Sequence, residues 1–139
     1  MFTVIGRFSP QVFAVFRIVT GLLFACHGSQ KLLGWPPAEQ GGGSSLPPIM
    51  LTAGIIELVG GLLVAVGFFT GIVAFICSGE MAVAYFMGHA SKGGPIPLVN
   101  KGELAALYSW VFLFIAAHGA GIWSIDSLLR RRTPVVTTS

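Results

Sequence analysis

Three ionisable side chains interrupt long apolar runs in this chain. Glu57 and Glu80 each stand near the middle of a run long enough to cross a bilayer, and Arg17 interrupts an earlier run. Because an unpaired charge in hydrocarbon is costly, we expect these three groups to meet inside a helix bundle. Two carboxylates against one guanidinium leave a surplus negative charge, which needs a proton or another partner. Such a cluster could relay protons or hydrogen-bond a quinone head group.

The same three residues have a second interpretation, which is a purely structural ion-pair network. Buried ionic groups can fix the register of packed helices without binding any ligand. The residue types alone do not choose between a structural role and a ligand or proton role, and both remain open at this point.

The composition places these charges in a membrane protein. Of 139 residues, 54% are hydrophobic and 9% are charged, and the mean hydropathy is +0.83, whereas a soluble domain carries about 25% charged residues. The length allows about four spans of roughly 20 residues with short connections. We therefore expect one membrane domain over residues 1–139 and no separate soluble domain.

The hydrophobic pattern predicts an all-α fold, an antiparallel bundle of four transmembrane helices with both termini on the same side. The expected spans are about 11–34, 48–69, 71–89 and 103–123, with a basic tail over 130–139. The second and third runs follow each other so closely that a tight turn is expected near Phe69 to Gly71. Asn100 followed by Glu103 predicts an N-cap with its reciprocal carboxylate at the start of the fourth span.

The basic residues predict the orientation of the chain in the membrane. The side that carries the termini holds four arginines, whereas the opposite loops hold three lysines; these are Arg7, Arg130, Arg131 and Arg132 against Lys31, Lys92 and Lys101. The positive-inside rule then favours cytoplasmic termini. We expect a multi-pass protein of a bacterial inner (cytoplasmic) membrane.

A rise of about 1.5 Å per residue sorts the polar side chains into two layers. The inner-to-middle layer is the expected catalytic or proton-handling site, and it comprises Arg17, Glu57, Glu80 and His118. The outer layer is the expected second, ligand-binding site or mouth, and it comprises His27, Gln30, Lys31 and Glu103. His118 and His27 could each instead be an ordinary hydrogen-bonded residue at a helix end.

Two helix faces support close packing around these layers. At 100° per residue, one face of the first span holds Arg17, Gly21, Phe24, Gly28 and Lys31, and one face of the second holds Gly54, Glu57, Gly60, Gly61 and Val64. Small residues beside Glu57 would allow another helix to approach this carboxylate closely.

No intrinsic redox motif accompanies the ionic residues. The sequence has no G-x-G-x-x-G, C-x-x-C or C-x-x-C-H pattern. Cys26 and Cys77 are expected about 13 Å apart along the membrane normal, too far for a disulfide. The three histidines are scattered, which argues against haem, and no metal-ligand pattern is present. The cofactor is left unknown, with quinone as the possibility that the carboxylates suggest.

Several segments together resemble the DoxX family. They are His27-Gly28-Ser29-Gln30-Lys31, Gly54-Ile55-Ile56-Glu57-Leu58-Val59-Gly60-Gly61, Asn100-Lys101-Gly102-Glu103, Gly119-Ala120-Gly121 and Ser124-Ile125-Asp126. The resemblance spans nearly the whole chain. It implies a small four-helix membrane protein of a family named after a subunit of a terminal or thiosulfate-linked quinone oxidoreductase. Many members of that family are described as oxidoreductases without a defined reaction.

Three functions follow as hypotheses. The resemblance implies a component of a quinone-linked membrane oxidoreductase, in which a partner supplies the redox centre. The missing cofactor motif favours a non-catalytic accessory subunit packed against a larger membrane complex. The intramembrane carboxylates would also suit a small-molecule or proton transporter, although the chain lacks inverted repeats of sufficient length unless it oligomerises.

The partners expected from the sequence are the lipid bilayer and either other membrane subunits or further copies of this chain. Nucleic acid is not expected, since the pI of about 9.2 rests on a few juxtamembrane basic residues. The residues after Arg132 are expected to form a disordered tail or a partner contact.

Overall fold

The computed structural model describes residues 4–37 and 45–132, and all regular elements in these ranges are helices. Their order is η1 (Val4–Phe8), α1 (Ser9–Leu33), α2 (Pro48–Ile55), η2 (Ile56–Gly60), α3 (Gly61–Val66), α4 (Thr70–Val83), η3 (Ala84–Ala90), α5 (Ser91–Gly93), α6 (Pro97–Asn100), α7 (Glu103–His118) and α8 (Ile125–Arg132). η1 is a 3₁₀-helix, and η2 and η3 are π-helices. The all-α prediction is confirmed, whereas the predicted tail after Arg132 lies outside the described residues.

Within the described ranges, three continuous helices are long and apolar enough to cross a membrane. They are Val4–Leu33, Pro48–Val66 and Thr70–Gly93, and the shorter apolar helix Glu103–His118 follows them. The fourth apolar helix was expected to reach residue 123, and this boundary is wrong. Gly119 and Gly121 have φ values of 88° and 67°, a region that suits glycine and ends a helix.

The turn between α3 and α4 is as tight as expected, although it lies slightly earlier in the chain. Gly67 has a φ of 72° and Phe69 a φ of 49°, and α4 begins at Thr70. A Cβ atom on Gly67 would lie 2.8 Å from Nη1 of Arg17. Both the backbone conformation and the neighbouring guanidinium therefore require glycine at this turn.

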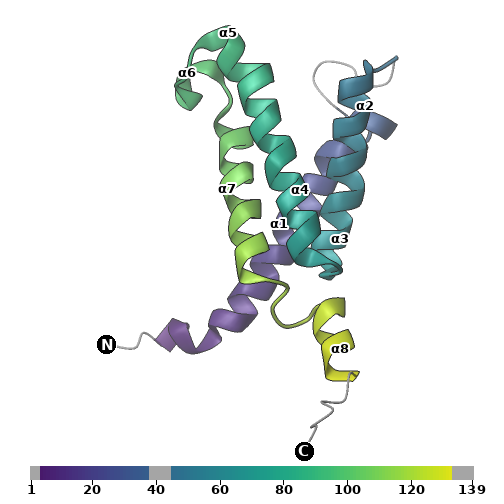
Figure 1. The fold of residues 1–139 in the computed structure, drawn as a ribbon, viewed down its shortest axis with the longest axis vertical. Helices are drawn as coiled ribbons and strands as arrows, with labels where there is room; N and C mark the ends of the chain where they lie inside the picture. Colours follow the sequence, from purple (N-terminus) through teal and green to yellow (C-terminus); the bar gives the residue numbers. More distant parts are fainter. Residues whose placement is uncertain (1–3, 38–44, 133–139) are drawn as a thin grey trace, which may run out of the picture.

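The helices associate as two pairs (Figure 1). α1 packs along α2, η2 and α3, and α4 packs along α7. The pairs cross near α8 and diverge toward α2 and α5. We call the end with η1, α8 and the α3–α4 turn the α8 end, and the opposite end the α5 end.

Glycines bring the backbones of the first pair into contact. A Cβ on Gly21 would lie 2.5 Å from the carbonyl oxygen of Gly61, and a Cβ on Gly61 would lie 2.5 Å from that of Gly21. No side chain separates the helices here, so dispersion contacts between backbones hold them together. The predicted faces are confirmed, because Gly21, Phe24 and Gly28 on one helix and Gly54 and Gly61 on the other are all buried.

Hydrogen bonds and aromatic rings join the remaining helices. The Ser78 hydroxyl donates to the Ser109 carbonyl at 2.7 Å, and the Ser109 hydroxyl donates to the Ser78 carbonyl at 3.1 Å, which ties α4 to α7. Phe24 of α1 meets Phe112 of α7 with ring centroids 4.5 Å apart. Both rings are fully buried, so the two pairs share one core.

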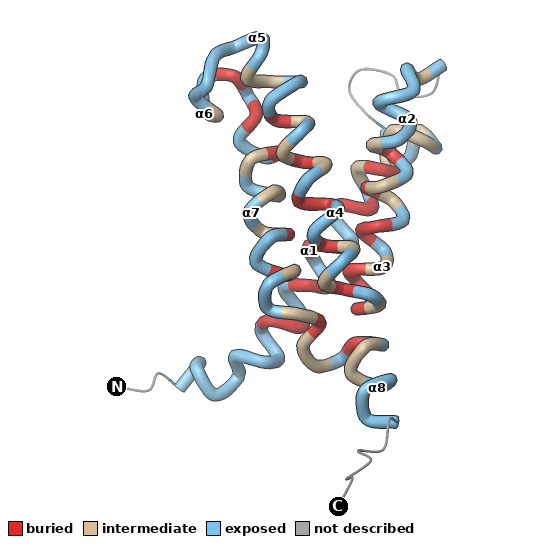
Figure 2. The backbone as a smooth tube through the Cα atoms, in the orientation of Figure 1, coloured by how far each residue is buried: buried red, intermediate tan, exposed pale blue. Residues whose placement is uncertain are grey.

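Many large apolar residues are exposed. The buried residues lie mainly along the helix stretches that face one another (Figure 2). Ile72, Phe75 and Trp110 are each about two-thirds exposed. A soluble monomer rarely presents so much continuous apolar surface, whereas a lipid environment solvates it. This exterior indicates a membrane protein.

The start of α7 differs from the predicted capping box. The Asn100 side chain accepts a hydrogen bond from the Gly102 N–H at 2.8 Å and donates to the Gly94 carbonyl at 2.8 Å. Lys101 has a φ of 58°, and Gly102 occupies the N-cap position. Asn100 therefore closes the loop before the helix, and the exposed Glu103 makes no reciprocal bond to it.

Asp126, at the start of α8, caps the start of α4 as well. Its carboxylate accepts hydrogen bonds from the N–H groups of Phe69 and Thr70, each at 2.9 Å, and from the Thr70 hydroxyl at 2.8 Å. Partial burial alone would raise the pKa of Asp126, but these hydrogen bonds, aided by the nearby Arg130, hold it below its ordinary value. The carboxylate anchors α8 to the α3–α4 turn.

The glycine contact leads to a stability prediction. Gly21→Ala should destabilise the protein by about 1–3 kcal/mol, because the new methyl group overlaps the Gly61 backbone. Gly79→Ala is the matched control: nothing lies within 4 Å of its Cβ position, so it should be neutral or stabilise by up to about 1 kcal/mol. Thermal unfolding in detergent compares the two. Equal effects would contradict the contact.

The Asp126 anchor predicts a pH-dependent contribution to stability. Asp126→Asn should cost about 1–2 kcal/mol near neutral pH, because the charged acceptor is lost. Since the folded pKa is depressed, this contribution is complete above the unfolded pKa of about 3.9 and is lost as pH falls through the folded pKa. The gap between wild type and variant should therefore close below about pH 4. Glu103→Gln, at an exposed carboxylate, controls for the charge change, and a pH-independent gap would refute the role.

Candidate functional site

Arg17 does not pair with either glutamate, which corrects the predicted ionic cluster. Its guanidinium donates to the carbonyls of Val64 at 2.7 Å and Ala65 at 2.6 Å. It also donates to the carbonyls of Trp123 at 2.8 Å and Ile122 at 3.4 Å. The physical reason is that α3 ends at Val66, where the last carbonyls of a helix lose their i+4 donors, although the Gly67 N–H still donates to the Val64 carbonyl at 3.1 Å. Arg17 adds donors to the Val64 and Ala65 carbonyls and is itself fully buried.

Lys31 takes the place expected for Arg17 and forms the ion pair with Glu57. The ammonium Nζ lies 2.5 Å from Oε1 of Glu57. The Lys31 side chain is 28% exposed and that of Glu57 only 2%. The pair therefore joins the two predicted layers, because the long lysine side chain reaches from the end of α1 to the middle of the second helix.

Glu80 adds a second carboxylate to this pair. It lies close enough to interact electrostatically with both Glu57 and Lys31. Oε2 of Glu57 and Oε2 of Glu80 are buried and accept no hydrogen bond from the described residues. Buried polar atoms are rarely left without a partner. The Lys31–Glu57–Glu80 cluster thus combines one cation, two carboxylates and two acceptor oxygens that are available for a proton or a donor.

Local backbone geometry sets the position of Glu57. The residue lies in the π-helix η2, and Gly60 and Gly61 follow it at the junction with α3. Single π-turns inside α-helices shift the direction of the side chains they carry and recur at functional sites. A Cβ on Gly60 would lie 2.6 Å from Sγ of Cys77, so this glycine lets α4, the helix that carries Glu80, approach η2.

Residues of the predicted outer layer surround the cluster unevenly. His27 meets the Tyr108 ring edge-on, with centroids 6.0 Å apart, and Tyr108 is within electrostatic reach of Glu57. Gln30 instead donates to the Pro37 carbonyl at 3.2 Å. His27 and Tyr108 can thus belong to the cluster. The Gln30 amide instead holds the chain segment that follows α1.

His118 and Glu103 lie apart from the cluster. His118 is exposed near the α8 end and stacks on Phe13, with ring centroids 3.6 Å apart. Glu103 is exposed at the first turn of α7 and has no hydrogen bond or ion pair within the described ranges. Opposite ends of α7 carry these two residues, so neither joins Glu57 and Glu80.

The cluster is closed toward the α8 end and more open toward the α5 end. Val64 follows Glu57 by seven residues, about two helical turns nearer the α8 end, and it is fully buried with Phe24 and Phe112. Lys31, on the other side, is partly exposed. Protons and polar ligands would therefore reach Glu57 from the α5 end.

Hydrogen bonding and proton exchange are the chemistry that these groups offer. No three His, Cys, Asp or Glu side chains in the described ranges are arranged to hold a metal ion. Cys26 is exposed and Cys77 is buried, and both are free thiols. The ammonium, carboxyl, phenol and imidazole groups near the cluster can donate to or accept from a small polar head group.

Sequence reasoning gave no role to two residues, Tyr108 beside the cluster and Asp126 at the α8 end. In the sequence, Tyr108 is one more aromatic residue in an apolar run. Only the structure, which places its ring against His27, connects it to the cluster. Asp126 carried a recognisable signal, because Ser124, two residues earlier, is a favoured N-cap residue. The Ser124 hydroxyl indeed accepts from the Ser127 N–H at 3.1 Å.

The Lys31–Glu57 pair predicts a measurable coupling energy. Lys31→Met and Glu57→Gln should each destabilise the protein, since each leaves a partly or fully buried charge alone. The double variant should recover part of the loss, giving a coupling energy of about 1–3 kcal/mol from thermal unfolding. A cycle of Lys31→Met with Glu103→Gln serves as the control and should be additive. Additivity in the Lys31–Glu57 cycle would argue against the pair.

Comparison with known proteins assigns this chain to a family. The model of the DoxX family matches residues 12–90. A Haemophilus influenzae protein, described as uncharacterized, is 42% identical over 124 residues, which cover 87% of this chain and 92% of that protein. No solved structure matches the chain. The matched region contains Lys31, Glu57 and Glu80, and the chain belongs to the DoxX family of membrane proteins.

Proposed function

We propose that this protein is an inner-membrane component of a quinone-linked oxidoreductase system, in which the Lys31–Glu57–Glu80 cluster binds a quinone head group and exchanges its protons. Four helices would span the membrane, with the α8 end in the cytoplasm, where Arg7, Arg130, Arg131 and Arg132 satisfy the positive-inside rule. Family membership supports the membrane role. The cluster supports the chemistry.

One observation carries the proposal: two carboxylates interact with a single ammonium group, and each keeps one buried oxygen without a hydrogen-bond donor. Oε2 of Glu57 and Oε2 of Glu80 accept no hydrogen bond in the described structure, although both residues interact with Lys31. A purely structural network would be expected to satisfy its own acceptors. The hydroxyl groups of a quinol are donors of the kind that such oxygens need.

The chemistry of the surrounding residues fits a quinone head group. A quinone presents two carbonyl oxygens on an apolar ring, so it needs donors at its edges and aromatic or aliphatic walls. Lys31 and the Tyr108 hydroxyl are donors, and Tyr108 and His27 are planar side chains near the cluster.

The residues would divide the work between binding and proton exchange. Lys31 would stay paired with Glu57, and Glu80 would accept or donate the proton, since it has no ammonium of its own. Bound quinone supplies two-electron, two-proton chemistry. A partner subunit would supply the redox centre that exchanges electrons with it, because amino-acid side chains of these types do not carry electrons.

The proposal predicts quinone binding that depends on Glu80. The purified protein should retain quinone extractable by organic solvent, and a short-chain ubiquinol analogue, kept reduced, should raise its melting temperature with the logarithm of its concentration. Glu80→Gln and Glu57→Gln should abolish this shift, because they remove the carboxylates that accept from the quinol.

The controls separate binding from folding. Glu103→Gln changes the same functional group at an exposed position and should leave the shift intact. Melting temperatures without ligand report whether each variant folds. Absence of both retained quinone and a thermal shift in the wild type would refute the quinone proposal, and wild-type shifts in Glu80→Gln would remove the cluster from it.

A further inference from the structure

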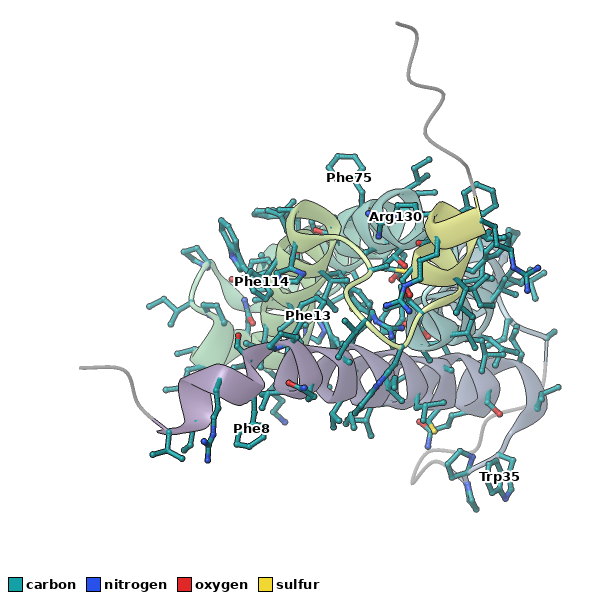
Figure 3. The ribbon with its side chains drawn as sticks, turned by 90° about the horizontal axis from the view of Figure 1, so that it is seen from below. Phe8, Phe13, Trp35, Phe75, Phe114 and Arg130 are labelled. Atoms are coloured by element: carbon teal, nitrogen blue, oxygen red, sulfur yellow. The ribbon has the colours of Figure 1, made fainter. Side chains whose placement is uncertain are left out.

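A hollow of about 360 Å³ opens at the α8 end, away from the carboxylate cluster. Its polar lining comes from Ser9 of α1, His118 of α7 and Arg130 of α8. Phe13, Ala120 and Ile122 supply apolar walls. Figure 3 views the molecule from this end and shows α8, with Arg130, beside the chain segment that leads from α7, with Phe13 and Phe114 on the neighbouring helices.

The charge around this hollow is one-sided. Arg7, Arg130, Arg131 and Arg132 all lie at the α8 end, whereas Asp126 is the one acidic residue among the described residues of α8 and its neighbouring loop. The Asp126 carboxylate already accepts three hydrogen bonds from Phe69 and Thr70. Arg130 contacts Asp126 through Nε, which donates to the Asp126 carbonyl at 3.4 Å. Asp126 lies within electrostatic reach of Arg130, and four arginines against this one carboxylate leave the α8 end around the hollow net positive.

The position of the hollow along the apolar surface suits a lipid. Ser9 lies near the start of α1, and beyond it Val12, Val15 and Phe16 expose apolar side chains. On α8, Leu128 is also exposed on a helix that ends in three arginines. The surface thus changes from basic to apolar along the molecule, as a membrane boundary changes from head groups to acyl chains.

We propose that this hollow binds the phosphate head group of an anionic phospholipid. Arg130 and His118 face the phosphate, and the acyl chains of the lipid lie on the apolar surface beyond Phe13. The site is separate from the proposed quinone cluster, and its occupant differs in charge and size. A bound lipid would tie α8 to α1 and α7 at the level of the membrane boundary.

Native mass spectrometry tests the proposal with a defined lipid mixture. The full-length protein is incorporated into nanodiscs that contain equal amounts of phosphatidylglycerol and phosphatidylcholine with the same acyl chains, and retained lipid is scored after release. The wild type should retain phosphatidylglycerol preferentially. Arg130→Gln should lower this retention about fivefold, the effect of one basic contact at a membrane surface, and Arg130→Lys should keep most of it.

Arg131→Gln is the matched control, because Arg131 lines a different hollow of about 450 Å³ on the other side of Ile122. It makes the same charge change on the same helix and should leave retention near the wild-type level. Equal losses in the two variants would replace the proposed site with a diffuse basic surface, and equal retention of both lipids by the wild type would overturn the proposal. Added inorganic phosphate should not displace the lipid; displacement would assign the hollow to free phosphate.

Discussion

Arg17 carries its charge into the apolar part of the molecule, where backbone carbonyls accept its hydrogen bonds and the Asp126 carboxylate lies within electrostatic reach. These carbonyls come from the end of α3 and from the loop after α7. The Val64 carbonyl also accepts from the Gly67 N–H, and Arg17 supplies the further donors that water would not provide in a lipid environment. One side chain of α1 therefore fixes where the second helix ends and where the chain lies after α7. The α3–α4 turn and the position of α8 depend on that junction.

This use of Arg17 determines what remains for the glutamates. Because the guanidinium is occupied at the α8 end, Glu57 depends on Lys31, which reaches it from the other end of α1. Glu80 then has no cation of its own in the described structure. The structural charge, on Arg17, and the charge available to the carboxylates, on Lys31, thus lie at different levels of one helix, α1. The glycine contacts lie between these two residues. A membrane helix bundle can be rigid at one level and reactive at another for this reason.

Sequence reasoning predicted the helices, the tight turn and the glycine faces, because these follow from local periodicity and from the steric needs of glycine. It identified Glu57, Glu80 and Lys31 but assigned the wrong cation to Glu57. The error has a physical origin. The depth of each residue was estimated from its rise along the helix axis, which ignores the length of a lysine side chain. The prediction also took carboxylates to be the natural partners of Arg17. Unsatisfied carbonyls at a helix end compete equally well, and their location depends on tertiary structure. Asp126 was undervalued for the same reason, since it serves a helix start 56 residues away.

The short length of α7 has a consequence for the lipid around it. A helix of 16 residues rises about 24 Å, which is less than the roughly 30 Å of an average hydrocarbon core. If α7 crosses the membrane as proposed, the bilayer beside it would have to thin, or its head groups would have to dip toward the ends of the helix. Water and protons would then come nearer to the middle of α7 than they do to α1, and Tyr108 would lie on this shortened path. Hydrophobic mismatch at one helix can in this way bring the aqueous boundary closer to a buried acid without any channel through the protein.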